Sequence, residues 1–306
     1  MRRDVSVEDI SDGRRYRSDD LVKIGTNGCS GCCDCCRMDP VIVLDPWDVY
    51  MLQKGTGLGL EKLLNNTVKL DVIDGLIQPV LKMAGGACPY LGADGRCEIH
   101  AFRPGICRLY PLGRSWEPVS DAESRSHAGA GSSAITRPAR AGDVPNTEDE
   151  RLRERLRYGQ EDFSYILQIN ECTHCTGSKV KIKKWLGIPD LPRYEDYCRE
   201  WHTFLKEART LCEMEERRAS APSAGQPAQA PSARATSAGG PSAGQPAPSS
   251  GQPVSGNGGS VIRKIVCMQI LEKCYLAGYD IGQDFYPQFE RQLAEARRSC
   301  GLSTAG

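Results

Sequence analysis

Apolar residues recur at helical spacing in four stretches of this chain, and the segments between them lack any period. Such spacing predicts helices that bury one face, whereas a short run of β-branched and aromatic residues predicts a strand. The expected elements are helices over 46–52, 60–64, 72–81, 180–186, 194–214, 261–276 and 285–297, a helix start at 103–108, and a strand over 163–169. The pattern predicts an α+β fold dominated by helices.

Two dipeptides add local detail to this pattern. Asp45-Pro46 predicts a helix start, because aspartate accepts the free N–H groups of the first turn and proline suits the first helical position. Asp94-Gly95 is a strong hairpin signal. A short β-hairpin there would bring Cys88 and Cys97 together.

Two segments hold too few apolar side chains to offset the entropy of ordering, and we expect both to be disordered. One is rich in Ala, Pro, Ser, Gly and Gln and repeats Ser-Ala-Gly-Gln-Pro at 223–227 and 242–246, and the other ends in a short charged helix at 151–156. The expected organisation is an N-terminal tail (1–20), a cysteine-cluster core (21–114), a low-complexity insert (115–157), a continuation of the core (158–215), a linker (216–260) and a C-terminal helical pair (261–306) that packs onto the core.

Composition narrows the classes of partner. Lys plus Arg and Asp plus Glu number 39 each, so bulk charge favours neither nucleic acid nor a membrane. No apolar run approaches the ~20 residues of a membrane helix, and the charged N-terminus lacks the apolar stretch of a secretory signal. We expect a cytoplasmic protein, in which structural disulfides are disfavoured.

Cysteines supply the main chemical signal. Eight of the 15 lie between positions 29 and 107, and five of these fall within eight residues, at Cys29, Cys32, Cys33, Cys35 and Cys36. Cysteines so close together rarely form unstrained disulfides with one another, whereas a short loop can turn several thiolates onto one metal. The spacing predicts zinc, iron or an iron–sulfur cluster, and a group of fortuitous free thiols is the alternative.

This loop carries only part of a metal site. Its first three cysteines are spaced as in bacterial ferredoxins, but the fourth cysteine, expected four positions after Cys35 and directly before a proline, is absent, since Asp39 precedes Pro40. Cys88, Cys97 and Cys107 are the natural donors to complete the site. Adjacent side chains point in different directions, so we expect Cys35 and Cys36 to serve different metals, or one of them to be unused.

The surroundings of Cys107 suggest how its thiol is activated. Pro104 is expected in the first turn of a helix, which places Cys107 near the positive end and should lower its pKa. Arg103 and Arg108 flank this cysteine. They either offset the negative charge of metal-bound thiolates or are ordinary surface charges.

Two further cysteine patterns remain open. Cys29-x3-Cys33-x2-Cys36 matches the radical S-adenosylmethionine spacing, but the chain lacks the repeated strand–helix units of the barrel which that chemistry normally needs. Cys172 and Cys175 form half of a zinc knuckle or a redox pair, and one of them is a candidate for an additional metal ligand. His100 is expected to be structural, and His174 is either a further ligand or a bystander.

The remaining motifs have simpler explanations. The basic run of Lys179, Lys181, Lys183 and Lys184 is either a solvated helix face or an anion site. Five cysteines lie on helical patterns without partners at ligand spacing, and we expect small buried hydrophobic residues at Cys198, Cys212, Cys267, Cys274 and Cys300.

The cysteine blocks resemble the YkgJ-type CxxCxxCC family, which is described as zinc- or iron-chelating. The matching residues are Cys29, Cys32, Cys35, Cys36, Cys88-Pro89-Tyr90-Leu91, 95–100 and 103–111, within 25–114. A weaker match covers 172–185, where Cys175-Thr176-Gly177 replaces a Cys-Pro-Gly-type element. The resemblance implies metal chelation, and some members of the wider group look like flagellin lysine N-methylases, in which an iron–sulfur centre is implied.

The leading hypothesis is a cytoplasmic protein that chelates zinc or iron in a small, irregular fold organised around the metal. The candidate ligands are Cys29, Cys32, Cys35, Cys36, Cys88, Cys97, Cys107, Cys172 and Cys175. The rivals are an iron–sulfur-dependent enzyme, such as a flagellin-type lysine N-methylase or a redox protein, and a metal carrier with a protein client. No Gly-rich loop after a strand marks a nucleotide fold that would support methyl transfer.

Overall fold

A computed structural model describes residues 6–25, 33–38, 40–118, 161–169, 171–172, 177–220 and 257–302. Most of the expected low-complexity insert and linker, together with the helix expected at 151–156, lies outside the described residues. Helices outweigh strands in the described residues, and the strands form small antiparallel pairs. The expected α+β class is therefore confirmed.

The elements follow one another in mixed order along the chain. The helices are α1 Val7–Ile10, α2 Pro46–Thr56, α3 Leu60–Asn66, α4 Gly105–Leu109, α7 Ile182–Leu186, α8 Leu191–Ser220, α9 Asn257–Leu271 and α10 Phe285–Ser299, with short 3₁₀ turns η1 Asp34–Cys36 and η2 His100–Phe102 and the π-helical turn η3 Glu272–Leu276. The strands are β1 Leu21–Gly25, β2 Val68–Ile73, β3 Leu76–Leu81, β4 Leu112–Pro118, β5 Glu161–Leu167 and β6 Ser178–Lys181. They pair as β1 with β6, β2 with β3 and β4 with β5, each antiparallel.

The start of α2 follows the chemistry expected of Asp45-Pro46. The Asp45 carboxylate accepts the Asp48 N–H at 2.8 Å, and the Asp48 carboxylate accepts the Asp45 N–H at 3.2 Å. This reciprocal capping satisfies two N–H groups that a helix start otherwise leaves without partners. The expected helix is confirmed, and Gly57 ends it in the left-handed conformation with φ 68°.

The helix expected over 72–81 is wrong, because this segment belongs to the β2–β3 hairpin. Asp74 and Gly75 form its turn with φ values of 48° and 80°. Positive φ at both central residues is the geometry that matches the twist of a two-residue hairpin. The segment preceding α2 extends this sheet, since the Leu44 N–H donates to the Pro79 carbonyl at 2.9 Å. The helix expected at 180–186 begins at Ile182, after strand β6.

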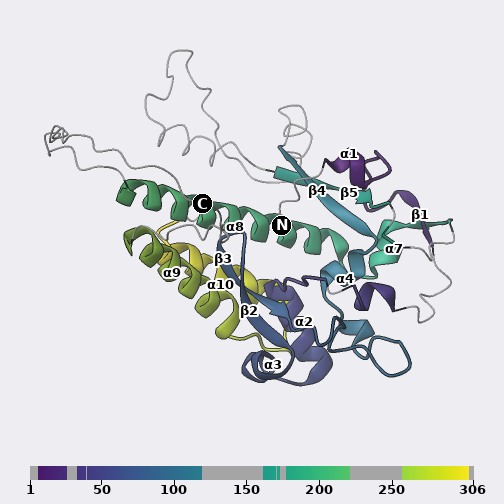
Figure 1. Ribbon diagram of the computed structural model, residues 1–306, viewed down its shortest axis with the longest axis horizontal. Coiled ribbons are helices and arrows are strands. Elements are labelled where there is room, and N and C mark those ends of the chain that lie inside the picture. Colours follow the sequence, from purple (N-terminus) through teal and green to yellow (C-terminus); the bar gives the residue numbers. More distant parts are fainter. Residues whose placement is uncertain are drawn as a thin grey trace, which may run out of the picture.

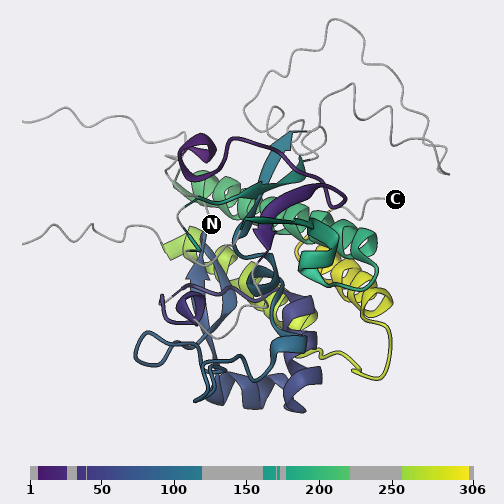
Figure 2. The same ribbon diagram turned by 90° about the vertical axis from the view of Figure 1, so that its right-hand side faces the viewer.

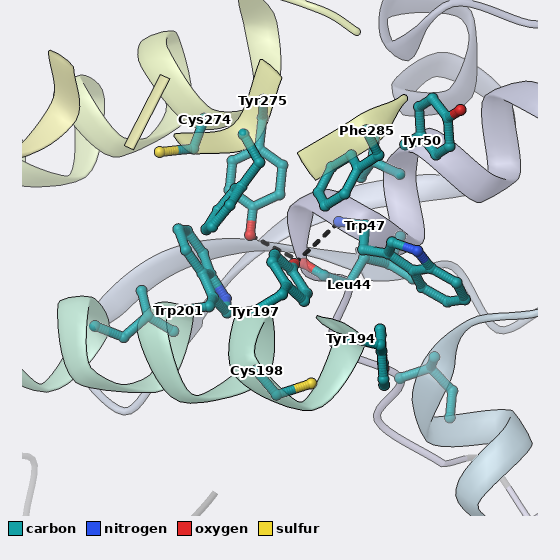
Figure 3. Packing of buried hydrophobic residues seen from close by; sticks show 14 of the residues in the cluster. Leu44, Trp47, Tyr50, Tyr194, Tyr197, Cys198, Trp201, Cys274, Tyr275 and Phe285 are labelled. Carbon is teal, nitrogen blue, oxygen red and sulfur yellow. Dashed lines mark hydrogen bonds between the residues drawn. The ribbon is translucent and has the colours of Figure 1, made fainter. Parts of the chain in front are cut away.

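The C-terminal helices pack against the rest of the fold through aromatic side chains. The long helix α8 runs between the β4–β5 pair and the helices α9 and α10 (Figure 1, Figure 2). In the core, Tyr197 of α8 lies beside Phe285 of α10, with ring centroids 5.2 Å apart (Figure 3). The Tyr275 hydroxyl donates to the Leu44 carbonyl at 3.0 Å, which ties the C-terminal helices to the segment preceding α2.

The ends of the described segments differ from the expected boundaries. Residues in the expected tail run along β5, since Ser11 bridges to Gln168 and Tyr16 bridges to Tyr165. Residues 115–118 complete β4 and residues 216–220 complete α8, so neither group belongs to a low-complexity segment. Across the described ranges, no helix combines the length and apolar character needed to cross a membrane.

Candidate metal centre

The described part of the cysteine loop begins with a sharp turn at Cys33. Its φ of 54° is left-handed, a conformation that is uncommon for residues other than glycine. The following 3₁₀ turn is closed by the Cys36 N–H, which donates to the Cys33 carbonyl at 2.9 Å. The Sγ atoms of Cys35 and Cys36 consequently lie 4.0 Å apart. The premise that these two side chains point in different directions is wrong, because both line one cavity.

Cys88 and Cys97 reach the same cavity from the turn region that follows β3. The Cys88 N–H donates to the Cys36 carbonyl at 2.8 Å, which fixes this residue beside the loop. Cys97 pairs with Leu91 in an isolated antiparallel bridge across a turn in which Gly95 has φ 76°. The expected hairpin is confirmed as a bridged turn, although neither side extends into a strand of its own.

Cys107 is held by the start of α4. The Gly105 N–H donates to the buried Asp48 carboxylate of α2 at 2.7 Å. A Cβ at Gly105 would lie 2.1 Å from the Tyr194 hydroxyl, so only glycine permits this close approach. Pro104 precedes the helix as its N-cap instead of standing within the first turn. Together these contacts orient α4 so that Cys107 lines the cavity.

The cavity has a volume of about 760 Å³. Its thiol wall comes from the loop, the bridged turn and α4, and consists of Cys33, Cys35, Cys36, Cys88, Cys97 and Cys107. Apolar side chains and Arg103 form other parts of the wall. Among the described residues, no group of three or more Cys, His, Asp or Glu side chains is arranged so that it could hold a metal ion.

Hydrogen bonds among three thiols separate their pKa values. The Cys36 thiol hydrogen-bonds to both neighbours, which lowers the pKa of Cys35 to about 6 and the pKa of Cys88 to about 7. The same hydrogen bonds raise the pKa of Cys36. Near neutral pH the thiolate therefore predominates at Cys35 and is partly populated at Cys88, and the thiolate is the form that binds metals.

Burial dominates at the other two thiols. It raises the pKa of Cys97, and together with the Asp48 carboxylate it raises the pKa of Cys107. The expectation that a helix start lowers the pKa of Cys107 is wrong, because α4 has only five residues and burial outweighs its dipole. A metal dication at this position would have to displace the Cys107 proton.

The two arginines beside Cys107 have different roles. Arg103 lines the cavity, and its charge opposes the effect of burial on the pKa of Cys107. Arg108 is buried and donates to backbone carbonyls, including that of Arg103 at 3.1 Å. Its guanidinium also lies 5.7 Å from the Trp47 ring centroid. Arg108 is therefore neither a counter-charge at the cavity wall nor a surface charge, but part of the packing beneath α4.

Of the other candidate residues, only Cys172 lies within the described residues. Cys29, Cys32, His174 and Cys175 lie outside the described residues. Cys172 is half-buried and does not line the cavity, but its neighbour Glu171 does. The Tyr110 hydroxyl donates to the Glu171 carbonyl, so the segment before Cys172 is fixed beside the cavity.

Most isolated cysteines are buried as expected. Cys198, Cys212, Cys267 and Cys274 belong to the hydrophobic core, and Cys300 is half-buried against it. In the basic run, the Lys183 ammonium lies 2.6 Å from the Asp19 carboxylate, as on an ordinary solvated face. The Arg103 Nη1–H donates to the His100 Nε2 atom at 2.8 Å, because a guanidinium can only donate.

Sequence reasoning missed the link between Asp48 and Gly105. It identified the start of α2 from Asp45-Pro46, but Asp48 also accepts an N–H group 57 residues further along the chain. A local motif could reveal the capping role, since an acidic residue stands three positions after the cap. No local pattern indicates the second contact, which depends on how α2 and α4 pack.

The fold and the cavity define an α+β protein with a thiol-lined cavity. Residues 28–126 match the model of the CxxCxxCC family, which is described as a putative zinc- or iron-chelating domain. This match confirms the resemblance seen in the cysteine blocks and covers every cysteine of the thiol wall. Comparison with curated proteins and with solved structures gives no match.

Proposed function

We propose that this protein chelates zinc or iron through the cysteines of its cavity. The observation that carries the proposal is the convergence of thiols from three separate segments on one cavity. Cysteines that served only as small hydrophobic residues would have no reason to gather around open space. The family match favours the same two metals.

The spacing of the thiols suits metal ligation. Two thiolates that bind a tetrahedral zinc at about 2.3 Å stand about 3.8 Å apart. The Sγ atoms of Cys35 and Cys36 are separated by 4.0 Å. Iron–sulfur clusters use the same ligand type, so this distance supports either metal.

The proposed donors extend beyond the described thiols. Cys32 adjoins Cys33 in the sequence, and Cys29 precedes it by three further positions. Glu171 lines the cavity next to Cys172, which makes Cys172 and Cys175 candidates for an additional ligand. The full proposed set is Cys29, Cys32, Cys35, Cys36, Cys88, Cys97, Cys107, Cys172 and Cys175, a number that allows more than one metal ion or a cluster.

Anaerobic purification followed by elemental analysis and an absorption spectrum tests the proposal. Zinc in a colourless protein identifies a zinc site, whereas iron and sulfide in a brown protein identify an iron–sulfur cluster. A preparation that contains neither metal and takes up neither zinc nor iron contradicts the proposal. A count of free thiols would not test the proposal, because the buried cysteines of α8 and α9 are free as well.

A second candidate function is catalysis or metal transfer at the same site. The cavity volume of about 760 Å³ favours it, since this space exceeds what one metal ion requires. We propose an iron–sulfur-dependent enzyme, such as a protein lysine N-methylase or a redox protein, or a carrier that passes its metal to a protein client. Labelled methyl transfer to a protein, reversible reduction of a cluster, and loss of metal to an added acceptor protein distinguish these activities.

The free thiols also bear on the compartment. None of the cysteines in the described ranges forms a disulfide bond, which suits a reducing environment such as the cytoplasm. We further propose that metal binding organises the segments from 21 to 114 and from 158 to 215 into one unit. Limited proteolysis with and without metal tests this, and equal cleavage of both forms would count against it.

A further inference from the structure

Helix α9 carries apolar side chains on two opposite faces. Val266 and Ile270 belong to the core and are buried. On the other face, Val261, Ile265 and Met268 keep 51%, 52% and 65% of their surface exposed. These three residues are separated by four and three positions, which places them in one stripe along the helix. A helix that is apolar on both faces is typical of one that is covered on both sides.

The neighbouring helix α10 shows that such exposure is not general on this protein. Both helices have 15 residues and pack against the same core. The solvent face of α10 is charged, with Glu290, Arg291, Glu295 and Arg298 exposed. Apolar side chains exposed singly need no explanation, whereas an exposed stripe of them indicates an interaction surface.

The stripe on α9 includes two opposite charges placed symmetrically about its centre. It continues into η3 at Leu276, which is 59% exposed, so it spans roughly 22 Å from Val261 at about 1.5 Å per residue. Lys264 and Glu272 are also exposed, and they stand four positions before and four positions after Met268. An antiparallel pair of identical helices places residue i of one copy against residue j of the other, and j against i. Each Lys264 would then lie opposite Glu272 of the partner subunit.

We propose that α9 binds α9 of a second copy of this chain, in antiparallel orientation, with the two-fold axis at Met268. Met268 then packs against Met268 of the partner subunit, and Val261 lies beside Leu276 of the partner subunit. A second copy is favoured over an unrelated apolar partner, because one stripe supplies both members of each charge pair. The parallel arrangement is disfavoured, since it places Lys264 against Lys264 of the partner subunit.

The contacts within one chain leave this charge pairing available. The Glu272 carboxylate lies 2.7 Å from the Lys273 ammonium of the same chain, but it is exposed, and an exposed ion pair of this kind contributes little. A stripe of four apolar side chains exposes less than the roughly 800 Å² that each partner buries in a standard interface. We therefore expect a weak dimer that dissociates on dilution, with a Kd on the order of 10 µM. In the described part of the chain no residue of α9 lines the cavity, so this inference is independent of the proposed metal chemistry.

Sedimentation velocity of the full-length protein under anaerobic conditions, from about 1 to about 200 µM, tests the proposal, and the dimer fraction should rise across this range. Met268→Lys places two like charges at the axis and should weaken the dimer at least about tenfold. Leu21→Lys is the matched control, because Leu21 is exposed on β1, at the opposite end of the molecule from α9 (Figure 1). It should leave the dissociation constant within about twofold of the original value. A monomer at every concentration, or equal dissociation constants in the two variants, overturns the proposal.

An exchange of charges tests the antiparallel arrangement separately. Lys264→Glu and Glu272→Lys each place like charges opposite one another, and each should weaken self-association about tenfold. An equimolar mixture of the two variants restores both pairs of opposite charge, so mixed dimers should form with about the affinity of the original protein. A mixture that associates no more tightly than either variant alone overturns the proposed arrangement. If a segment of the same chain covers the stripe instead, the protein stays monomeric and the charge variants change nothing, which also overturns the proposal.

Discussion

The cavity cysteines (Cys35, Cys36, Cys88, Cys97 and Cys107) and the core cysteines (Cys198, Cys212, Cys267 and Cys274) place one residue type in two environments. The cavity cysteines are half-buried and face shared space. The core cysteines are fully buried among aromatic and aliphatic side chains of the helices, as Figure 3 shows for Cys198 and Cys274. The residue type is the same in both groups, so a difference in reactivity between them must come from the surroundings of each thiol.

The pKa values of the two groups show the physical difference. Burial raises the pKa of Cys198 to about 12 and that of Cys212 to about 11. In the cavity, hydrogen bonding from Cys36 instead lowers the pKa of Cys35 to about 6 and that of Cys88 to about 7. Hydrogen bonds among Cys35, Cys36 and Cys88 therefore outweigh the effect of burial on the pKa values of Cys35 and Cys88.

Removal of a cavity thiol should have the largest effect on metal binding. Structural zinc sites contribute about 10–16 kcal/mol, so one of four thiolates accounts for about 3 kcal/mol, or about 100-fold in affinity. We expect Cys107→Ala to lose metal to this extent in a competition titration. Cys300→Ala, at a half-buried cysteine outside the cavity, should keep full metal content. Equal metal content in the two variants would show that Cys107 is not a ligand.

Metal removal should separate the two groups of thiols directly. A tightly bound metal stabilises the folded state by mass action, so a chelator should lower the unfolding temperature by about 10 °C. In the metal-free protein, brief treatment with iodoacetamide at pH 7 should modify Cys35 and Cys88 before the core cysteines, because the lowered pKa values of these two thiols give them larger thiolate fractions. The core cysteines should react only in denaturant. Peptide mass spectrometry checks the order, and labelling of Cys198 before Cys35 would contradict the comparison.

The sequence predicts the helices better than the strands, for a physical reason. The start of α2 and most of α8 and α10 follow from caps and from apolar residues at helical spacing, which are local properties. The β2–β3 hairpin was expected as helix, because its apolar residues fit either period. Asp74-Gly75 carries the same turn signal as Asp94-Gly95 and would have located this hairpin.

The cysteines of the thiol wall could be predicted from the sequence, but the residues that hold the segments around them in place could not. Dense cysteine blocks reveal the residues that gather in the cavity, since few other roles explain such spacing. Asp48 and Arg108 act through contacts with distant segments: Asp48 holds Gly105, and Arg108 donates to the carbonyls of Leu186 and Gly187. Such contacts depend on tertiary packing, which one sequence does not display.

Substitution of Asp48 should have an effect of intermediate size on both the stability of the fold and the affinity for metal. Asp48→Ala removes the acceptor for the buried Gly105 N–H, which should cost about 1–3 kcal/mol of stability in urea unfolding. Metal affinity should fall as well, because α4 carries Cys107. Burial and the neighbouring Asp45 raise the pKa of Asp48, so the neutral side chain of Asp48→Asn should preserve more of both properties. If Asp48→Ala weakens the fold but leaves metal affinity unchanged, the contact does not position Cys107.

The smallest expected effect concerns the core cysteines alone. Burial, partly opposed by the charge of Arg114, raises the pKa of Cys198 to about 12. Above the ordinary thiol pKa the unfolded chain loses this proton while the folded chain keeps it, so the folded state binds more protons and stability falls as pH rises. Between pH 8 and pH 10 this single thiol should lower the free energy of unfolding by roughly 1–2 kcal/mol.

Cys198→Ala isolates that contribution from those of the buried tyrosines, which share the same direction. The variant should be less stable at pH 8, because it leaves a small cavity, yet its free energy of unfolding should decline less steeply toward pH 10. Parallel curves for the two proteins in urea titrations would show that the buried thiol titrates normally. A shallower curve for the variant would instead establish that burial keeps the Cys198 thiol protonated in the folded protein, unlike the Cys35 thiol, whose pKa is lowered to about 6.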